Sequence, residues 1–405
     1  MNNDDVKFCN ELFQAFAGVG ALADGGVTRL GYSAEEDEMH AIFTRLAEEQ
    51  GLKVSTDQAG NTFAENSDSS ESVLIASHLD SVVDGGRYDG VAGVISGLLI
   101  ANWAKLENAR IPLRVGAIRC EESSRFGCAT IGSGLITGNV ESDDAGNLKG
   151  KDGVTLGEEF EKRGYSLHPE TIQGLKEYLE LHIEQGRSLE ASGTEIGVVT
   201  SIVAPRRYVI KIEGLAEHSG ATPMGMRQDA LDAAAEMILA VEKIGDGEGR
   251  RCKSVATVGV ISNYPNVMNV IPGEVELGID TRASSLESLN YMEKCIDSEI
   301  SLIEEEREVK VTKTIKSAGI PVELNENSEQ GLKKAADALG YSSCYMPSGA
   351  GHDAMMFTKL CPVGMVFIPC LKGISHNRLE HAEYSDVCKG AEVMYEYLKG
   401  KYHAD

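Results

Sequence analysis

The sequence predicts an α/β fold with a mostly parallel sheet, interrupted by a smaller α+β domain with an antiparallel sheet. The chain has 405 residues, more than the roughly 250–300 residues at which a single hydrophobic core stops growing. Short apolar runs alternate with helical patterns in both outer parts of the chain, as in βαβ units. Between these parts, strands of alternating polarity replace the continuous apolar runs, which is typical of an antiparallel sheet with one solvated face.

The first outer part contains helices followed by strands. The stretch SAEEDEMHAIFTRLAEEQGL begins at Ser33 with acidic residues in its first turn, which is a typical helix start. The runs VSTDQAGNTFAE, SVLIASHLD and LRVGAIRCEE are short and bounded by turn residues, so we expect strands. An apolar helix from Val91 to Lys105 lies between the last two runs. This order predicts that the two strands are parallel neighbours in a buried sheet.

The interrupting domain is expected at 207–315, so the main domain comprises 1–206 and 316–405. YVIKIEGLAEHSG alternates in polarity, a helical pattern runs from Gln228 to Ile244, and further strands and a charged helix follow. After the interruption, a helix, the apolar strand PVGMVFIP and a C-terminal helix from Ser385 restore the buried pattern.

Composition excludes several classes of function. The formal net charge of −25 argues against nucleic acid or an anionic membrane surface as a partner. Nine cysteines without a C-x-x-C pair predict reduced thiols in a cytoplasmic protein. The N-terminal stretch has no long apolar segment, so we expect no signal peptide. The longest apolar segment, VAGVISGLLIANWA, is too short to span a bilayer.

The stretch SHLDSVVDGGRYDG places His78, Asp80 and Asp89 directly after an apolar run. Open α/β sheets bind ligands at the carboxyl ends of their strands. In an extended chain His78 and Asp80 point to the same side, so Asp80 can orient the imidazole ring without binding metal itself. Asp89 lies just before the expected helix. We interpret this stretch as part of a metal site.

Three further segments add candidate ligands. Glu121 and Glu122 end another strand, and adjacent residues of an extended chain face opposite ways, so one can bind metal while the other faces substrate; a solvated acidic corner is the alternative. His182 lies in YLELHIEQG, where a buried structural histidine is the alternative. KGISHNRLEHAEYS offers His376 and His381, which could instead be hydrogen-bonded loop residues.

The four segments together are more specific than any one of them. Three histidines, one aspartate and one glutamate give only nitrogen and oxygen ligands, which suits a hydrolytic Zn²⁺ or Mn²⁺ centre. A shared carboxylate allows such a set to hold two ions about 4 Å apart with a bridging water. The charge of the two ions would lower the pKa of that water toward ~7.

These motifs resemble the two-metal aminoacylase and carboxypeptidase superfamily over nearly the whole chain. LELHIEQG, EESSRFG, HSGATPMGMRQDA and SGAGHDA resemble one branch of it. That branch contains N-carbamoyl-L-amino-acid hydrolases, allantoate amidohydrolases, ureidoglycolate hydrolases and β-ureidopropionase-type enzymes. The residues that carry the resemblance are His78, Asp80, Gly85, Gly86, Asp89, Gly90, Glu121, Glu122 and His381.

The resemblance implies a role for each ligand. His78, Asp89 and His182 would bind one metal ion, and Asp89 would bridge to a second ion held by Glu122 and His381. Two divalent ions per subunit are implied, with Zn, Mn and Co all suited to the ligands. The resemblance further implies Glu121 as the general base, with Asp80 as a catalytic residue that orients His78. Peptidase branches usually carry a carboxylate where this chain has His182, so the histidine favours carbamoyl or ureido substrates.

The resemblance also implies substrate contacts. Gln185, His218, Asn269 and Arg282 resemble substrate-binding residues, and His218 would also polarise the reacting carbonyl. The inserted domain resembles a lid and dimerisation domain, which implies a homodimer. Without the resemblance, HSG and DTR could be ordinary features of strand ends.

The implied activity is cleavage of the carbamoyl or ureido C–N bond of an N-carbamoyl-L-amino acid or a related ureido acid by a metal-bridged hydroxide. Ser123 and Ser219 stand where the branch often has Gly and Ala, which leaves the substrate open. Allantoate and ureidoglycolate are alternative substrates, and an aminoacylase or dipeptidase is a further alternative.

Two readings from other classes are less favoured. GSGLITG is glycine-rich but lacks the spacing of a nucleotide-binding loop. A metal-free scaffold is disfavoured because the ligand set and the base are complete.

Overall fold

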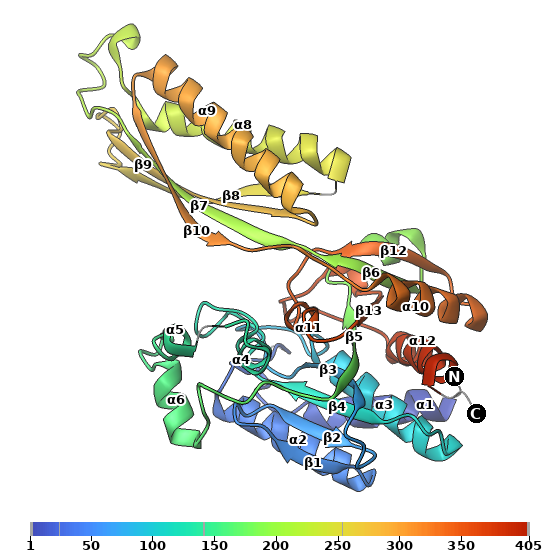
Figure 1. Cartoon of the computed structure of the whole chain (residues 1–405). Helices are drawn as coiled ribbons and strands as arrows, with labels where there is room; N and C mark the ends of the chain where they lie inside the picture. The colour runs from blue at the N-terminus through green and yellow to red at the C-terminus, as the bar shows by residue number, and fades with distance from the viewer. Residues whose placement is uncertain (1–2, 24, 141, 253, 403–405) are drawn as a thin grey trace. The chain divides into compact units, whose positions relative to one another are not determined.

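The computed structural model describes residues 3–23, 25–140, 142–252 and 254–402. Its contacts divide the chain into two compact units (Figure 1). The first unit comprises Met1–Thr200 and Leu324–Asp405, and the second comprises Ser201–Glu323. The limits expected from the sequence, 207 and 315, both fall inside the second unit.

The large sheet has a parallel centre and antiparallel edges. Among the described residues, nine strands follow the order β1-β2-β4-β3-β5-β13-β6-β11, with β12 paired to β6. The four central strands are parallel, and those at either side of them are antiparallel where their pairing is given. The strands are β1 (Lys53–Thr56), β2 (Thr62–Glu65), β3 (Ser72–His78), β4 (Leu113–Ile118), β5 (Leu175–Ile183), β6 (Ile196–Ile202), β11 (Val322–Glu323), β12 (Ser343–Ser348) and β13 (Val363–Ile368).

The predicted strand VSTDQAGNTFAE is in fact a hairpin. Its two halves form β1 and β2, which pair antiparallel, with Asp57 accepting backbone N–H groups of Ala59 and Asn61 in the turn. An Asp that binds the backbone ahead of it is a common turn signal.

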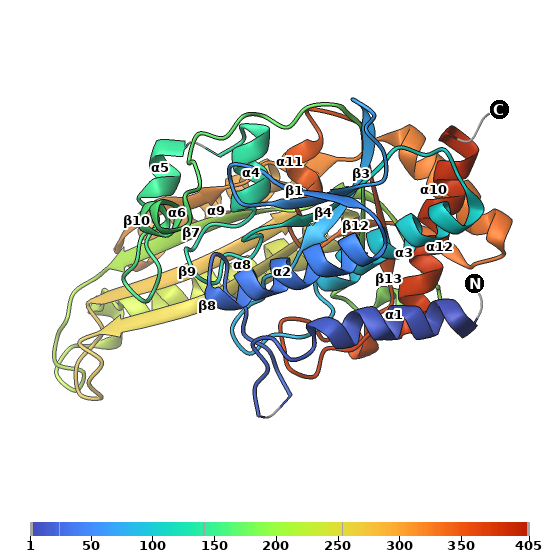
Figure 2. The ribbon, with the colours of Figure 1, turned by 90° about the horizontal axis from the view of Figure 1, so that it is seen from below.

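Helices cover the sheet of the first unit. α3 packs on β3, β4 and β5, α12 packs on β5 and β13, and α1 packs on both of these helices. Twelve residues of α3 are buried, which explains its lack of a polar face. α2 packs on the β1–β2 hairpin (Figure 2). The helices of this unit are α1 (Asn3–Phe16), α2 (Ala34–Glu49), α3 (Val91–Glu107), α4 (Ile131–Thr137), α5 (Ser142–Gly146), α6 (Leu156–Arg163), α7 (Ser188–Ser192), α10 (Glu326–Leu339), α11 (Ala354–Phe357) and α12 (Tyr384–Tyr402), with a 3₁₀ turn η2 (Leu371–Gly373).

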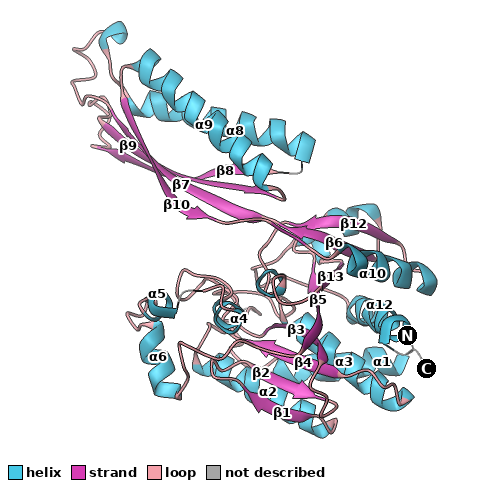
Figure 3. Cartoon of the chain, in the orientation of Figure 1, coloured by secondary structure: helices cyan, strands magenta, loops and turns pink. Residues whose placement is uncertain are grey.

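The second unit is a four-stranded antiparallel sheet in the order β10-β7-β9-β8, with two long helices on one face (Figure 3). Alternate residues of β7 and β9 are buried against α8 and α9, as the alternating pattern predicts. The elements are β7 (Ala204–Glu213), η1 (Met224–Met226), α8 (Ala230–Cys252), β8 (Val255–Tyr264), β9 (Glu274–Ala283), α9 (Leu286–Arg307) and β10 (Lys310–Ala318). The two sheets confirm the predicted fold class. Among the described helices, none has both the length and the apolar character that crossing a membrane requires.

Candidate metal centre

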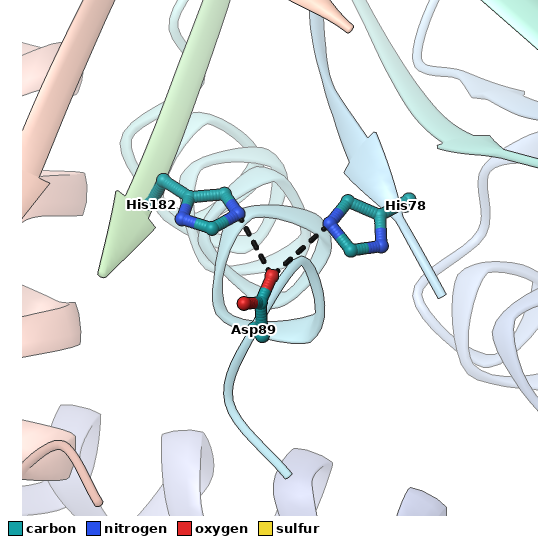
Figure 4. A group of neighbouring side chains, drawn as sticks. All are labelled: His78, Asp89 and His182. Atoms are coloured by element: carbon teal, nitrogen blue, oxygen red, sulfur yellow. Dashed lines mark ion pairs between the residues drawn. The ribbon is translucent and has the colours of Figure 1, made fainter. Parts of the chain in front are cut away.

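His78 and His182 lie on either side of the Asp89 carboxylate. The Nε2 atoms of His78 and His182 lie 3.2 Å and 3.1 Å from Asp89 Oδ1, and Figure 4 shows both rings directed at this one oxygen. His78 ends β3 and His182 is near the end of β5, its parallel neighbour. Parallel strands bring their carboxyl ends to one edge of the sheet, so residues 104 positions apart meet there.

Two backbone features fix Asp89 at this edge. Gly90, the N-cap of α3, has φ 66°, a conformation that favours glycine. A Cβ atom there would lie 2.5 Å from the carbonyl oxygen of His78. The buried carboxylate of Glu380 accepts the N–H groups of both Tyr88 and Asp89, at 2.9 and 3.0 Å. The carboxylate of Asp89 is thereby held between the two imidazole rings.

A second group of possible ligands shares Asp89. His376 Nε2 lies 3.4 Å from Asp89 Oδ2 and 3.1 Å from Glu122 Oε1. One ligand atom from each of these three residues lies within 4.8 Å of the other two, as in the group formed by His78, Asp89 and His182. Asp89 therefore offers one oxygen to each group, which is the arrangement of a bridging carboxylate.

The structure does not bring the expected fifth ligand, His381, to the second group. His381 bonds the hydroxyl of Tyr88 at 3.0 Å and Glu383 at 3.2 Å, and it belongs to none of the ligand groups found among the described residues. The reason is local: Ser375 donates to Asp89 Oδ2, and this contact brings the next residue, His376, to the second group.

Glu121 lies beside the first group. Its Oε2 is 3.9 Å from His78 Nε2, and its side chain is buried. Glu121 and Glu122 do not continue β4 as an extended segment; they follow a turn in which Cys120 has φ 52°. Asp80 accepts the N–H groups of Glu121 and Glu122 at 3.0 and 3.1 Å.

Asp80 also holds the ring of His78. The Nδ1 atom of His78 lies 3.1 Å from the carbonyl oxygen of Asp80 and 3.4 Å from its carboxylate. Both oxygens favour a proton on Nδ1 and so leave Nε2 free for a metal ion. His182 is fixed in the same way, because its Nδ1 lies 2.9 Å from the carbonyl oxygen of Ile183.

The cluster has an excess of negative charge. Burial alone would lower the pKa of His78, but its hydrogen bonds to Asp80 and Asp89 raise that pKa well above the usual value. Hydrogen bonds to Asp89 and Glu122 raise the pKa of His376 to about 11. Burial raises the pKa of Glu121 well above its usual value, although His78 opposes this shift. Carboxylates grouped in this way need compensating positive charge.

The donor set fits divalent metal ions. Although His182 Nε2 is buried and 3.1 Å from Asp89 Oδ1, it has no hydrogen-bond partner among the described residues. A buried polar atom without a partner destabilises the folded state. A bound metal ion would explain the contact, because two ligands of one ion lie close together without a hydrogen bond between them. Imidazole and carboxylate ligands without a thiolate suit Zn²⁺, Mn²⁺ or Co²⁺.

Two more side chains contact this cluster. Gln185 Nε2 donates to Asp89 Oδ2 at 2.6 Å, so this predicted substrate contact does lie at the centre. His352, within the motif SGAGHDA, packs edge-to-face on His182 with ring centroids 4.5 Å apart. The Ser348 hydroxyl lies 2.8 Å from His352 Nε2. The sequence marks His352 only as part of the motif SGAGHDA, because a single histidine after a glycine-rich turn has no spacing rule that identifies it as a site residue.

The other predicted substrate contacts lie in the second unit. Asn269 and His218 are on neighbouring loops, joined by the Ser219 N–H to Asn269 carbonyl bond at 3.1 Å. Both side chains are exposed. Arg282 lies near the end of β9, with its Nε 3.2 Å from Asp280 Oδ1.

The choice between the two late histidines can be tested directly. His376→Ala should lower the metal content of the purified protein by about one ion per chain, since it removes a ligand of the second group. His381→Ala removes an imidazole five residues away and should leave metal content unchanged. The measurement is elemental analysis of both variants; equal loss from His381→Ala would restore His381 as the ligand.

Comparisons with known proteins identify the family of the chain. Residues 74–400 match the family described as peptidase family M20/M25/M40. The N-carbamoyl-L-amino acid amidohydrolase of Geobacillus stearothermophilus is 36% identical over 390 residues, which cover 93% of this chain and 94% of that protein. The allantoate amidohydrolase of Escherichia coli is 33% identical over 388 residues, covering 93% of each.

A solved structure shares the fold over almost the whole chain. The amidase of the hydantoinase/carbamoylase family from Burkholderia multivorans superposes with a TM-score of 0.90, at 33% identity and with 97% of each chain covered. The sequence matches extend across both units of this chain. The chain therefore belongs to peptidase family M20/M25/M40 and is a hydrolase.

Proposed function

We propose that the chain is a metal-dependent amidohydrolase that cleaves the carbamoyl or ureido C–N bond of an N-carbamoyl-L-amino acid. The observation that carries the proposal is the pair of ligand groups that share Asp89, with the Glu121 carboxylate 3.9 Å from His78 Nε2. The names of the two relatives, which act on N-carbamoyl-L-amino acids and allantoate, support the substrate class. Allantoate and ureidoglycolate are the alternative substrates.

The residues of the chain supply the proton transfers. Two divalent ions bound by His78, Asp89, His182, Glu122 and His376 would supply Lewis acidity and acidify a water molecule. Glu121 accepts a proton from the water as its oxygen adds to the carbamoyl carbon. Glu121 then delivers that proton to the leaving nitrogen as the C–N bond breaks. Burial, which raises the pKa of Glu121, suits a group that must accept and release a proton. Asp80 keeps His78 in the tautomer that this arrangement requires.

The substrate carboxylate needs a cation, because the chain carries a net charge of −25. Arg282 is our candidate, because a guanidinium can bond a carboxylate through two parallel N–H groups; in this structure its Nε lies 3.2 Å from Asp280 Oδ1. His218 and Asn269 would donate to the carbonyl oxygen that becomes negative during the reaction. Gln185, 2.6 Å from Asp89, would contact the substrate near the ions.

Arg282→Lys should raise KM far more than it lowers kcat, since lysine cannot reproduce the two-pronged carboxylate contact. Arg207→Lys is a matched control, because Arg207 bonds the same Asp280 carboxylate at 2.9 Å. Steady-state kinetics with an N-carbamoyl amino acid measures both. An unchanged KM for Arg282→Lys would remove Arg282 from this role.

We also propose that the chain forms a homodimer through the second unit. β8 is an edge strand of ten residues, and Val255, Val260, Ile261 and Tyr264 on it are exposed apolar side chains. A long apolar edge strand is a ready partner for another strand. Sedimentation analysis, which gives the mass in solution, tests this proposal.

The function is tested by ammonia release from a panel of N-carbamoyl amino acids, allantoate and ureidoglycolate, and by release of free amino acid from N-acetyl amino acids and dipeptides as comparators. We expect the highest kcat/KM with a ureido compound after reconstitution with Zn²⁺, Mn²⁺ or Co²⁺. Faster hydrolysis of an N-acetyl amino acid or a dipeptide would instead identify an aminoacylase or dipeptidase.

A further inference from the structure

The turn after β4 is held by an unusual series of hydrogen bonds. Four consecutive backbone N–H groups each donate to a buried side chain, at distances of 2.8–3.1 Å. The N–H of Arg119 donates to Asn61, that of Cys120 to Glu36, and those of Glu121 and Glu122 to the two oxygens of Asp80. This turn ends in the proposed base and in a proposed metal ligand.

The turn depends on a left-handed residue that is not glycine. Cys120 has φ 52°, a conformation that is uncommon for residues with a side chain. Its thiol also fits closely against Gly31, where a Cβ atom would lie 2.2 Å from Cys120 Sγ. A turn with this conformation persists only when surrounding contacts stabilise it, and the N–H of Cys120 has one such contact, with Glu36.

Glu36 lies where its carboxylate can stabilise the left-handed turn at Cys120. It is 0% exposed and lies in the first turn of α2, 84 positions before Cys120. Its Oε1 accepts the Cys120 N–H at 2.8 Å, and its Oε2 accepts the Tyr32 N–H at 2.6 Å and Arg119 Nη1 at 3.0 Å. It belongs to neither ligand group, so its contacts with the centre run through the backbone of the turn.

We infer that Glu36 is a positioning residue: its carboxylate fixes the left-handed turn at Cys120 and thereby the directions in which Glu121 and Glu122 leave the backbone. The inference rests on the proposed function, in which Glu121 moves the proton and Glu122 binds metal. Displacement of a reacting group by about 1 Å is enough to lower a rate on the order of 10²-fold.

Glu36→Gln is a selective test because an amide has one accepting atom. Its oxygen will face Arg119 and Tyr32, which offer two donors, one of them charged. The NH₂ group then faces the Cys120 N–H, and two donors repel each other. The substitution therefore breaks the contact with the turn while it keeps the size of the side chain.

We expect Glu36→Gln to lower kcat on the order of 10²-fold with KM changed by less than about twofold. Two metal ions per chain should remain. Asp37→Asn is the control, because Asp37 also bonds Arg119, at 2.8 Å, but does not contact the Cys120 N–H. If loss of a charge near Arg119 were the cause, both variants would lose the same activity, and the inference would be overturned.

Hydrogen exchange gives a readout that does not depend on activity. The Cys120 amide, measured in peptides that cover 119–122, should exchange slowly in the parent and in Asp37→Asn, and faster in Glu36→Gln. Unchanged exchange in Glu36→Gln overturns the inference even if no ureido substrate is hydrolysed. A parent protein that hydrolyses no ureido compound, with the expected exchange pattern, would contradict only the proposed function.

A second substitution separates positioning from general stability. Cys120→Gly combined with Glu36→Gln should recover part of the lost kcat, since glycine adopts the left-handed conformation without strain. If Glu36→Gln does not fold, Glu36→Asp replaces it: the charge near Arg119 stays, but the shorter side chain withdraws from the Cys120 N–H and kcat falls. Full kcat in folded Glu36→Asp with faster Cys120 exchange would refute the inference.

Discussion

Asp89→Asn is expected to abolish the binding of both metal ions and, with it, the activity. Oδ1 of Asp89 faces His78 and His182, and Oδ2 faces His376. An asparagine offers one neutral oxygen and cannot serve both groups. Metal ions contribute several kcal/mol to such reactions, so kcat should fall on the order of 10³-fold or more.

The measurement for Asp89→Asn is metal content by elemental analysis alongside turnover. Asp84→Asn is the matched control, because Asp84 lies five residues before Asp89 but in none of the ligand groups formed by described residues. That control should keep two ions per chain. An Asp89→Asn protein with two bound ions would refute the bridging role.

Glu121→Gln is expected to lower kcat by about 10²–10⁴-fold, the usual contribution of a general acid–base group. Glutamine keeps the size of the side chain but cannot accept the proton of the attacking water. Metal content should be unchanged, since Glu121 is in neither ligand group.

The adjacent residue provides the comparison. Glu122→Gln should lose activity together with about one metal ion per chain, because Glu122 lies 3.1 Å from His376 in the second group. Elemental analysis thus distinguishes the roles of the two neighbouring glutamates, base and metal ligand, which a rate measurement alone would not distinguish. Near-normal turnover of Glu121→Gln would exclude it as the base.

Much of the fold could be predicted because its buried strands appear in the sequence as short apolar runs. Val73–Ala76 and Val115–Ile118 are continuous apolar stretches, and such stretches occur where both faces of a strand are buried. The rule that ligands bind at the carboxyl ends of strands then predicted a site at His78. These inferences needed only the period of the pattern and the order of the elements, whereas the pairing of His78 with His182 was implied by the family resemblance alone.

The remaining features depend on contacts between residues that are distant in sequence. His376 could not be preferred over His381 from spacing, because the contact of Ser375 with Asp89 spans 286 positions. The sequence predicts an extended segment at Cys120 and not a turn, since the acceptor that stabilises the turn lies 84 positions earlier. No local pattern in either segment reports such a partner.

The continuity of the second unit has a consequence for the order of folding during synthesis. Ser201–Glu323 is one uninterrupted segment, so its four-stranded sheet can close as soon as it has left the ribosome. The sheet of the first unit cannot be completed at that stage, because β5 gains its parallel neighbour β13 only when Val363–Ile368 has been made. At about 5–20 residues per second, the ribosome needs on the order of 20 seconds to travel from His182 to Ser375. The nascent chain therefore carries His78, Asp89 and His182 for that period without Ser375 or His376, so the first ligand group is complete before the second exists.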